Sequence, residues 1–254
     1  MVAVSRRAAL IALASVPLAT RLLEPGRRAR AEVVGDPVTI TVPSGRSVTA
    51  VASFPAVMPA PAVMSIHGAY GSSDWYKSLP GKLAGDGFVG LAVDLFDGEV
   101  TDGGGFLRDK ALANFDRTME TFASWVGWLK RDQRTTGKLG TVGFSFGAYC
   151  ALEAAMRTPI DASVLYYGVT DASAADFARI EGPLLGHFAE RDDLLAAAAV
   201  KRFEVKAKEA GISTEIHWYA AEHSFANPEF PGYDQAAAEL AWDRTVKFLQ
   251  TGLG

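Results

Sequence analysis

Residues 139–156 read LGTVGFSFGAYCALEAAM, and they contain the pattern Gly-x-Ser-x-Gly at 143–147, centred on Ser145. The residues predict an apolar strand over 139–144 and an apolar helix over 146–156. Glycines on both sides of the serine allow strand and helix to pass close together, which leaves the serine on a tight, strained turn at a helix N-terminus. We interpret the stretch as a turn that presents a nucleophilic serine. The alternative is a glycine-rich turn with a structural role alone.

The alternation of strand and helix extends along the rest of the chain. Predicted strands lie at 38–42, 47–54, 62–66, 88–95, 139–144, 162–167, 184–188 and 213–219. Predicted helices lie at 74–84, 107–129, 146–156, 194–210 and 233–249, and a glycine-rich loop at 98–105. Strands that are joined by helical crossovers form a parallel sheet that is covered on both faces. We therefore predict one doubly wound α/β domain over 32–254, with its first two strands as an antiparallel hairpin at one edge.

Composition excludes several classes of protein. The 254 residues are 49% hydrophobic and 21% charged, with a net charge of −4, so neither a disordered chain nor a basic nucleic-acid-binding surface is expected. Cys150 is the single cysteine, so the chain has no internal disulfide and no Cys-x-x-Cys pair. The sequence also lacks a Walker loop, an H-E-x-x-H motif and a G-x-G-x-x-G motif after a strand, so no cofactor and no metal are expected.

The first 31 residues resemble an export signal. Ser5-Arg6-Arg7 precedes a weakly polar run over 8–20, which is typical of the twin-arginine type and is shorter than the roughly 20 residues that span a bilayer. An A-x-A cleavage site follows at 29–31. Removing 1–31 takes away six arginines and one glutamate, so that −4 becomes −9 over 223 residues. We expect an acidic, exported protein, periplasmic or secreted and without stable membrane insertion; the alternative is an uncleaved leader that tethers it to the membrane.

A serine hydroxyl needs a base to remove its proton, and His223 is the favoured candidate among four histidines. It lies in the loop after the last predicted strand, at the sheet edge where ligands bind in such folds. His187 lies inside an apolar strand, so we predict that it is buried in the core. His217 alternates with apolar residues and is expected to face solvent or the opposite layer. His67 precedes a glycine, and we prefer a structural role for it, as a side chain that bonds to the backbone of a tight turn.

The base needs an acid, and Asp192 is the favoured candidate because it follows the predicted strand 184–188. Asp193 is a rival that fits better as the N-cap of the next helix. Asp171 is a second rival, although it too precedes a helical stretch. The order Ser145, Asp192, His223 is the order of the catalytic triad in α/β-hydrolases.

Several of these residues resemble the dienelactone hydrolase family of α/β-hydrolases. The similarity includes Gly-x-Ser-x-Gly, the segment from His187 to Asp192, the loop His223-Ser224-Phe225-Ala226-Asn227 and the strand end Val93-Asp94-Leu95-Phe96. It runs in order from about residue 38 to the last helix. The resemblance implies an α/β-hydrolase fold, a triad of Ser145, Asp192 and His223, and cleavage of a carboxylic ester or lactone through an acyl-enzyme.

This chain departs from the family pattern at three places. The archetypal nucleophile is cysteine, whereas this chain has Ser145, and we interpret Cys150 as a core residue. An archetypal glutamate that helps to activate the thiol corresponds to Gly68. Two archetypal arginines that bind the carboxylate of the lactone correspond to Gly98 and Asn227. Without a bidentate cation, the namesake substrate should be held poorly.

The oxyanion hole and the pocket complete the predicted site. The backbone N–H of Phe146 and that of Ala69 are the expected oxyanion donors. Aromatic residues of strand ends and loops are candidates for the substrate pocket, with few basic residues near them, which favours a neutral or apolar acyl group. These pocket candidates are Tyr70, Phe96, Phe144 and Phe225. The sequence leaves two alternatives open: an amide or peptide hydrolase that uses the same triad, and a non-catalytic protein of this fold that binds a small molecule or a protein.

Overall fold

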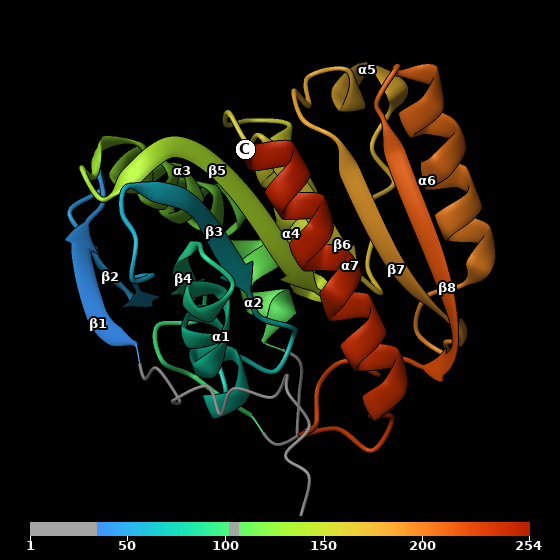
Figure 1. Cartoon of the computed structure of the whole chain (residues 1–254). Coiled ribbons are helices and arrows are strands. Elements are labelled where there is room, and N and C mark those ends of the chain that lie inside the picture. The colour runs from blue at the N-terminus through green and yellow to red at the C-terminus, as the bar shows by residue number, and fades with distance from the viewer. Residues whose placement is uncertain (1–34, 102–106) are drawn as a thin grey trace, which may run out of the picture. The chain divides into compact units, whose positions relative to one another are not determined.

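Eight strands form one sheet in the order β1-β2-β4-β3-β5-β6-β7-β8 (Figure 1). The computed structural model describes residues 35–101 and 107–254, so the predicted export signal over 1–31 lies outside the described residues and stays a prediction. The strands are β1 (Asp36–Thr41), β2 (Ser47–Ser53), β3 (Ala60–Ile66), β4 (Val89–Val93), β5 (Thr135–Phe144), β6 (Ala162–Tyr166), β7 (Leu184–Arg191) and β8 (Thr214–Glu222). All eight predicted strands are present.

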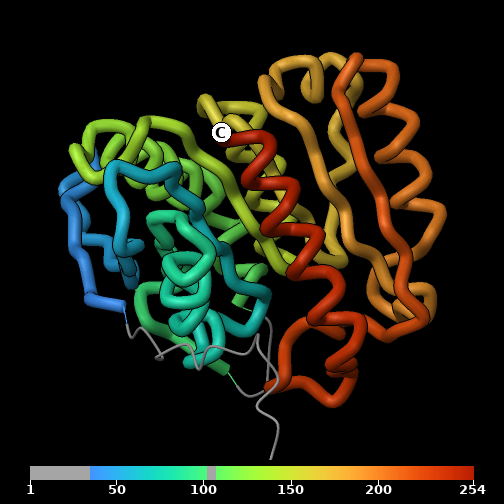
Figure 2. Tube along the Cα trace, in the orientation of Figure 1, coloured from blue at the N-terminus to red at the C-terminus, as the bar shows by residue number. Residues whose placement is uncertain are grey.

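The sheet is mostly parallel, as predicted. Strands β3 to β8 pair in parallel with their neighbours, whereas β1 pairs antiparallel with β2, and β2 antiparallel with β4. The hairpin therefore lies at one edge, and β8 lies at the other (Figure 2). The carboxyl ends of the parallel strands meet at one edge of the sheet, and this edge is where an α/β fold places its ligand site.

Helices cover both faces of the sheet. They are α1 (Asp74–Gly85), α2 (Arg108–Ala113), α3 (Phe115–Arg131), α4 (Phe146–Ala155), α5 (Ala174–Phe177), α6 (Ala197–Glu209) and α7 (Gln235–Leu253). Helices α1 and α7 lie on the face toward the viewer in Figure 1, and their buried side chains form one hydrophobic cluster with alternate strand residues such as Val63 and Val142. The second cluster contains buried residues of α3, α4 and α6 with the intervening strand residues, such as Met64. Because side chains alternate across a strand, each central strand contributes to both cores.

The predicted helix over 107–129 is wrong in one respect, since it is two helices. Asn114 has φ −121° and ψ 44°, which ends α2 and precedes the first residue of α3. Its side-chain amide donates a hydrogen bond to the carbonyl oxygen of Lys110, an acceptor on the helix that it ends. Short polar side chains that bond to the local backbone disfavour a helix interior, which accounts for the break. Apolar periodicity alone does not reveal it. Within the described residues, no helix has both the length and the apolar character of a membrane span.

Candidate active site

The turn at Ser145 has the strained geometry that the sequence predicts. Ser145 has φ 53° and ψ −114°, between the end of β5 and the first residue of α4. A Cβ atom on Gly143 would lie 2.2 Å from the carbonyl oxygen of Gly147, and one on Gly147 would lie 2.2 Å from that of Ile66. Only glycine therefore permits α4 to pass so close to β5 and β3. This crossing places the serine hydroxyl at the carboxyl edge of the sheet.

His223 lies within hydrogen-bond distance of the serine. Its Nε2 atom is 2.9 Å from Ser145 Oγ, although the two residues are 78 positions apart in the chain. His223 directly follows β8, and the next residue, Ser224, has a left-handed φ of 64°. The turn behind it is closed by Asn227, whose backbone N–H donates to the carbonyl oxygen of Ser224. The loop after the last strand thus presents the imidazole to the serine, as predicted.

Asp192 contacts the opposite side of the imidazole. Its two carboxylate oxygens lie 2.9 and 2.8 Å from His223 Nδ1, and its side chain is nearly buried. The same carboxylate accepts the backbone N–H groups of Leu194 and Leu195, each at 2.8 Å. An acceptor-only carboxylate at Nδ1 requires the proton on that nitrogen, which leaves Nε2 free to accept the proton of Ser145. The three residues therefore form the chain of hydrogen bonds that a nucleophilic serine needs.

Neither of the two rival acids bonds to His223, although Asp193 lines the same cavity. Asp193 is not the N-cap that the sequence predicts, because α6 begins only at Ala197 and its N-cap is Ala196. The side chain of Asp192, one residue earlier, accepts the N–H groups of Leu194 and Leu195, and the helix starts three residues later than predicted. Asp171 is exposed and pairs with Lys206.

The two predicted oxyanion donors flank the serine. Phe146 is the first residue of α4, so its N–H group has no partner within the helix. Ala69 belongs to the loop after β3, and the neighbouring Gly68 approaches the serine so closely that a Cβ atom there would lie 3.9 Å from Ser145 Cβ. Phe146, Ala69 and Ser145 all line the same cavity. Both residues with a predicted donor therefore lie at the wall of the cavity that contains the serine.

This cavity has a volume of about 630 Å³ and also contains His223. Of the four predicted pocket aromatics, only Tyr70 lines it. Phe96, Phe144 and Phe225 are buried instead: Phe96 packs on His67, and the rings of Phe144 and Phe225 lie against Tyr166 and Tyr219. That part of the prediction is wrong because side-chain alternation and turn geometry direct these rings into the protein core.

Sequence reasoning missed several residues that line the cavity, and for most of them the sequence holds no signal. Tyr149 could have been found, since it lies one helical turn after Ser145 and so points to the same side of α4. The aromatic and apolar residues that were missed are Tyr76, Leu112, Tyr149, Tyr167, Val169, Leu194, Leu195 and Phe230. The charged residues that were missed are Arg108, Asp109, Arg191 and Glu222. Asp193, considered in the sequence only as an acid or an N-cap, lines the cavity as well.

The charges of the cavity differ from the sequence-based expectation. Gly98 and Asn227 supply no cation, as expected; Asn227 is fully buried, and Gly98 donates its N–H to Asp94. The expectation of few basic residues is wrong, however, because Arg108 and Arg191 reach the cavity from α2 and from the end of β7. Three carboxylates line the cavity as well, so its wall has mixed charge. Among the described residues, no cluster of three His, Cys, Asp or Glu side chains could hold a metal ion.

His187, His217 and Cys150 do not line the cavity. His187 is buried, with Tyr219 Oη 2.9 Å from Nδ1 and Thr245 Oγ1 3.1 Å from Nε2, and burial lowers its pKa well below the ordinary value. His217 is partly exposed and contacts Glu215. Cys150 is buried, and burial raises the pKa of its thiol well above the ordinary value, which disfavours the reactive thiolate. These positions confirm His187 and Cys150 as core residues.

Comparison with known proteins identifies similar sequences. The model of the dienelactone hydrolase family matches residues 48–253. Carboxymethylenebutenolidase 1 from Cupriavidus pinatubonensis is 28% identical over 233 residues, which cover 85% of this chain and 97% of that protein. A carboxymethylenebutenolidase from a Pseudomonas species is 28% identical over 201 residues, covering 75% of this chain and 84% of that protein.

Solved structures share the fold. A dienelactone hydrolase-like promiscuous phosphotriesterase from metagenomic libraries has a TM-score of 0.78 at 21% identity, covering 87% of this chain and all of that chain. A thermostable esterase from Pseudomonas putida has a TM-score of 0.72 at 17% identity, covering 90% of this chain and 86% of that chain. At these identities the likeness shows the α/β-hydrolase fold alone.

Proposed function

Because the chain belongs to the dienelactone hydrolase family, we propose that it hydrolyses carboxylic esters or lactones with Ser145 as the nucleophile. The observation that carries this proposal is the chain of hydrogen bonds from Ser145 through His223 to Asp192, at the wall of a cavity large enough for a small-molecule substrate. Relatives named carboxymethylenebutenolidase support the reaction class.

The proposed reaction has two halves. Ser145 Oγ attacks the ester carbonyl carbon while His223 Nε2 takes the hydroxyl proton, and Asp192 stabilises the imidazolium that forms. The N–H groups of Phe146 and Ala69 donate to the negative oxygen of the tetrahedral intermediate. The intermediate collapses as His223 returns the proton to the departing alcohol, which leaves an acyl-serine. Water, activated by the same imidazole, then releases the acid and regenerates the serine.

The cavity supports a substrate with a substantial apolar part. Two large apolar side chains at its wall are exposed, Leu112 at 42% and Leu194 at 68%. Exposed apolar groups at a concave site are available to cover apolar surface of a ligand. Positions 98 and 227 carry no arginine, and the two arginines that do reach the cavity, Arg108 and Arg191, share its wall with three carboxylates. This mixed charge does not single out a carboxylate-bearing lactone as the preferred substrate.

Replacing Leu194 by serine tests this substrate preference. We expect kcat/KM for p-nitrophenyl octanoate to fall roughly 5- to 20-fold, and that for p-nitrophenyl acetate to change less than about twofold, since an apolar contact of one or two methylene groups contributes about 1 to 2 kcal/mol. The matched control is Leu240→Ser, which changes an exposed leucine of α7 that does not line the cavity. Equal losses for acetate and octanoate would contradict a role in binding the acyl chain.

Labelling with a fluorophosphonate tests the nucleophile directly. The probe phosphonylates a serine only where a base activates the hydroxyl, so we expect one modified residue, Ser145, in the peptide map obtained by mass spectrometry. Prior incubation with a p-nitrophenyl ester should slow the labelling. Modification of a different residue, with Ser145 unmodified, would show that Ser145 is not the nucleophile.

The amide-hydrolase alternative is tested with p-nitroanilides that carry the same acyl groups as the esters. Turnover of the anilides at rates equal to those of the esters would support this alternative.

A further inference from the structure

The loop after β3 places its backbone beside the serine. It begins at His67, and Gly68 lies so close to neighbouring groups that a Cβ atom there would be 3.0 Å from Tyr76 Oη and 3.6 Å from the carbonyl oxygen of Phe144. The loop carries Ala69, whose N–H is the second of the two proposed oxyanion donors. A donor of this kind works only if it is already directed at the oxyanion when the charge develops.

His67 is buried and uses both ring nitrogens. The backbone N–H of Leu95 donates to Nε2 at 3.0 Å, which requires Nε2 to be the unprotonated nitrogen. The proton therefore lies on Nδ1, which donates to the carbonyl oxygen of Gly68 at 2.8 Å. The ring of Phe96 lies 4.7 Å from the imidazole, so the ring is also held by packing. Burial lowers the pKa of His67 and favours the neutral form that these two hydrogen bonds need.

The hydrogen bond to Gly68 determines the direction of the next N–H group. The carbonyl of Gly68 and the N–H of Ala69 belong to one peptide unit, and the one cis bond among the described residues lies elsewhere, at Met58-Pro59. In a trans peptide the C=O and N–H bonds point in opposite directions. An imidazole that holds the carbonyl oxygen of Gly68 thus directs the N–H of Ala69 away from itself. Among the described residues, Ala69 and Ser145 line the cavity and His67 does not.

We propose that His67 is a positioning residue: its neutral imidazole orients the Gly68–Ala69 peptide so that the N–H of Ala69 faces the oxyanion formed at Ser145. This inference rests on the proposed function, because it assigns a task within the same reaction. Two further bonds hold the following peptides of the loop, since Leu107 donates its N–H to the carbonyl of Ala69 and Thr101 to that of Tyr70, each at 2.9 Å.

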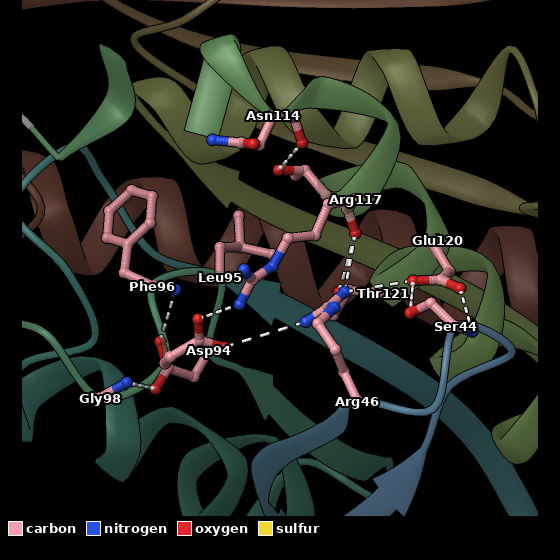
Figure 3. Close-up of polar contacts among 12 residues, drawn as sticks. Ser44, Arg46, Asp94, Leu95, Phe96, Gly98, Asn114, Arg117, Glu120 and Thr121 are labelled. Atoms are coloured by element: carbon pink, nitrogen blue, oxygen red, sulfur yellow. Dashed lines mark hydrogen bonds and ion pairs between the residues drawn. The ribbon is translucent and has the colours of Figure 1, made fainter. Parts of the chain in front are cut away.

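The donor that holds His67 is itself fixed. Leu95 belongs to the turn after β4, where the carboxylate of Asp94 accepts the N–H groups of Phe96 at 2.9 Å and of Gly98 at 2.5 Å (Figure 3). Beyond this turn, Asp97 contacts Arg117 of α3 and lies 3.9 Å from Arg46, in the loop between β1 and β2. The guanidinium of Arg46 also donates to Glu120 and Thr121 of α3 (Figure 3). The imidazole therefore connects the oxyanion loop to a turn that contacts both the loop of the β1–β2 hairpin and helix α3.

Replacing His67 by phenylalanine removes both hydrogen bonds and keeps a ring. We expect kcat for p-nitrophenyl butyrate to fall roughly 10- to 100-fold, less than the roughly 10²- to 10³-fold cost of deleting an oxyanion donor, because the N–H remains but loses its direction. KM should change less than about threefold, since the substrate carbonyl is neutral in the ground state. The inhibition constant of a trifluoromethyl ketone, which forms a negative oxygen on Ser145, should rise by the same factor as kcat/KM falls.

The matched control is His187→Phe. His187 is also fully buried with a partner at each ring nitrogen, but it does not line the cavity. Both variants should lose thermal stability, and His187→Phe should keep kcat within about twofold of the parent when both are assayed well below their Tm.

Two conservative variants make the test independent of the folding of His67→Phe. The amide of His67→Asn can replace the Nδ1 donor to Gly68 and should retain more of kcat than His67→Gln, whose amide lies nearer the Nε2 position.

Three results would overturn the inference: parental kcat and inhibition constant in His67→Phe, an equal loss of kcat in His187→Phe, or His67→Gln as active as His67→Asn. Failure of the proposed function gives a different result, namely full activity in Ser145→Ala, and this can be measured separately.

Discussion

Ser145→Ala is expected to lower kcat for p-nitrophenyl butyrate by roughly 10⁴- to 10⁶-fold, the range found when the nucleophile of a serine hydrolase is removed. Without Oγ there is no atom to form the acyl-enzyme, and His223 loses the group whose proton it accepts. Steady-state hydrolysis measures the loss.

The alanine variant is a clean test because the substitution changes little else. The backbone at Ser145 already holds a residue with a Cβ atom at φ 53°, so alanine introduces no new strain. We expect the free energy of unfolding to change by less than about 1 kcal/mol. Ser65→Ala provides the control, since Ser65 is a buried serine of β3 that bonds to the carbonyl of Leu91 and does not line the cavity. A Ser145→Ala enzyme that keeps more than about a hundredth of the parental kcat would refute the proposed nucleophile.

Asp192→Asn is expected to lower kcat by about 10⁴-fold, as when an asparagine replaces the triad acid in other serine hydrolases. The carboxylate of Asp192 accepts three N–H groups, from Leu194, Leu195 and His223. An asparagine that keeps its oxygen toward the two backbone groups must present its NH₂ group to Nδ1. That nitrogen then has to accept, the ring proton moves to Nε2, and His223 can no longer take the proton of Ser145.

The control for this variant is Asp171→Asn, the rival acid of the sequence analysis. Asp171 is exposed and its carboxylate contacts Lys206, so its replacement should leave kcat within about twofold of the parent. The two variants should unfold at similar temperatures, because asparagine has the size of aspartate. Circular dichroism and a thermal melt establish this before the kinetics are compared. An Asp192→Asn enzyme with more than about a tenth of the parental kcat would show that another group orients His223.

The three residues of the proposed triad could be predicted because each follows a strand of a parallel sheet. Strand ends are marked locally, by apolar runs that stop at polar or turn residues, and the carboxyl ends of parallel strands share one edge. Residues 145, 192 and 223 follow β5, β7 and β8, so their meeting was implied once the strands were assigned. Glycines at 143 and 147 were similarly informative, because the close approach of α4 tolerates no Cβ atom.

The pocket could not be predicted in the same way. Whether an aromatic ring near a strand end enters the cavity or the core depends on its χ1 angle and on the neighbour that it packs against, and neither is encoded within a few residues. Phe225 turned into the core against Tyr219, whereas Phe230, five residues later, lines the cavity. Arg108 and Arg191 reach the cavity from elements 83 residues apart.

By itself, the sequence determined the α/β class, the hairpin at the sheet edge, the strained turn at Ser145 and the identities of the three residues proposed as the triad. These follow from short-range physics: side-chain periodicity, glycine at crossings, and polar residues at strand ends. The tertiary structure alone decided the wall of the cavity and the two hydrogen bonds of His67. Both depend on contacts between loops that are distant in the chain, where the packing of the whole fold, and no local preference, sets the direction of each side chain.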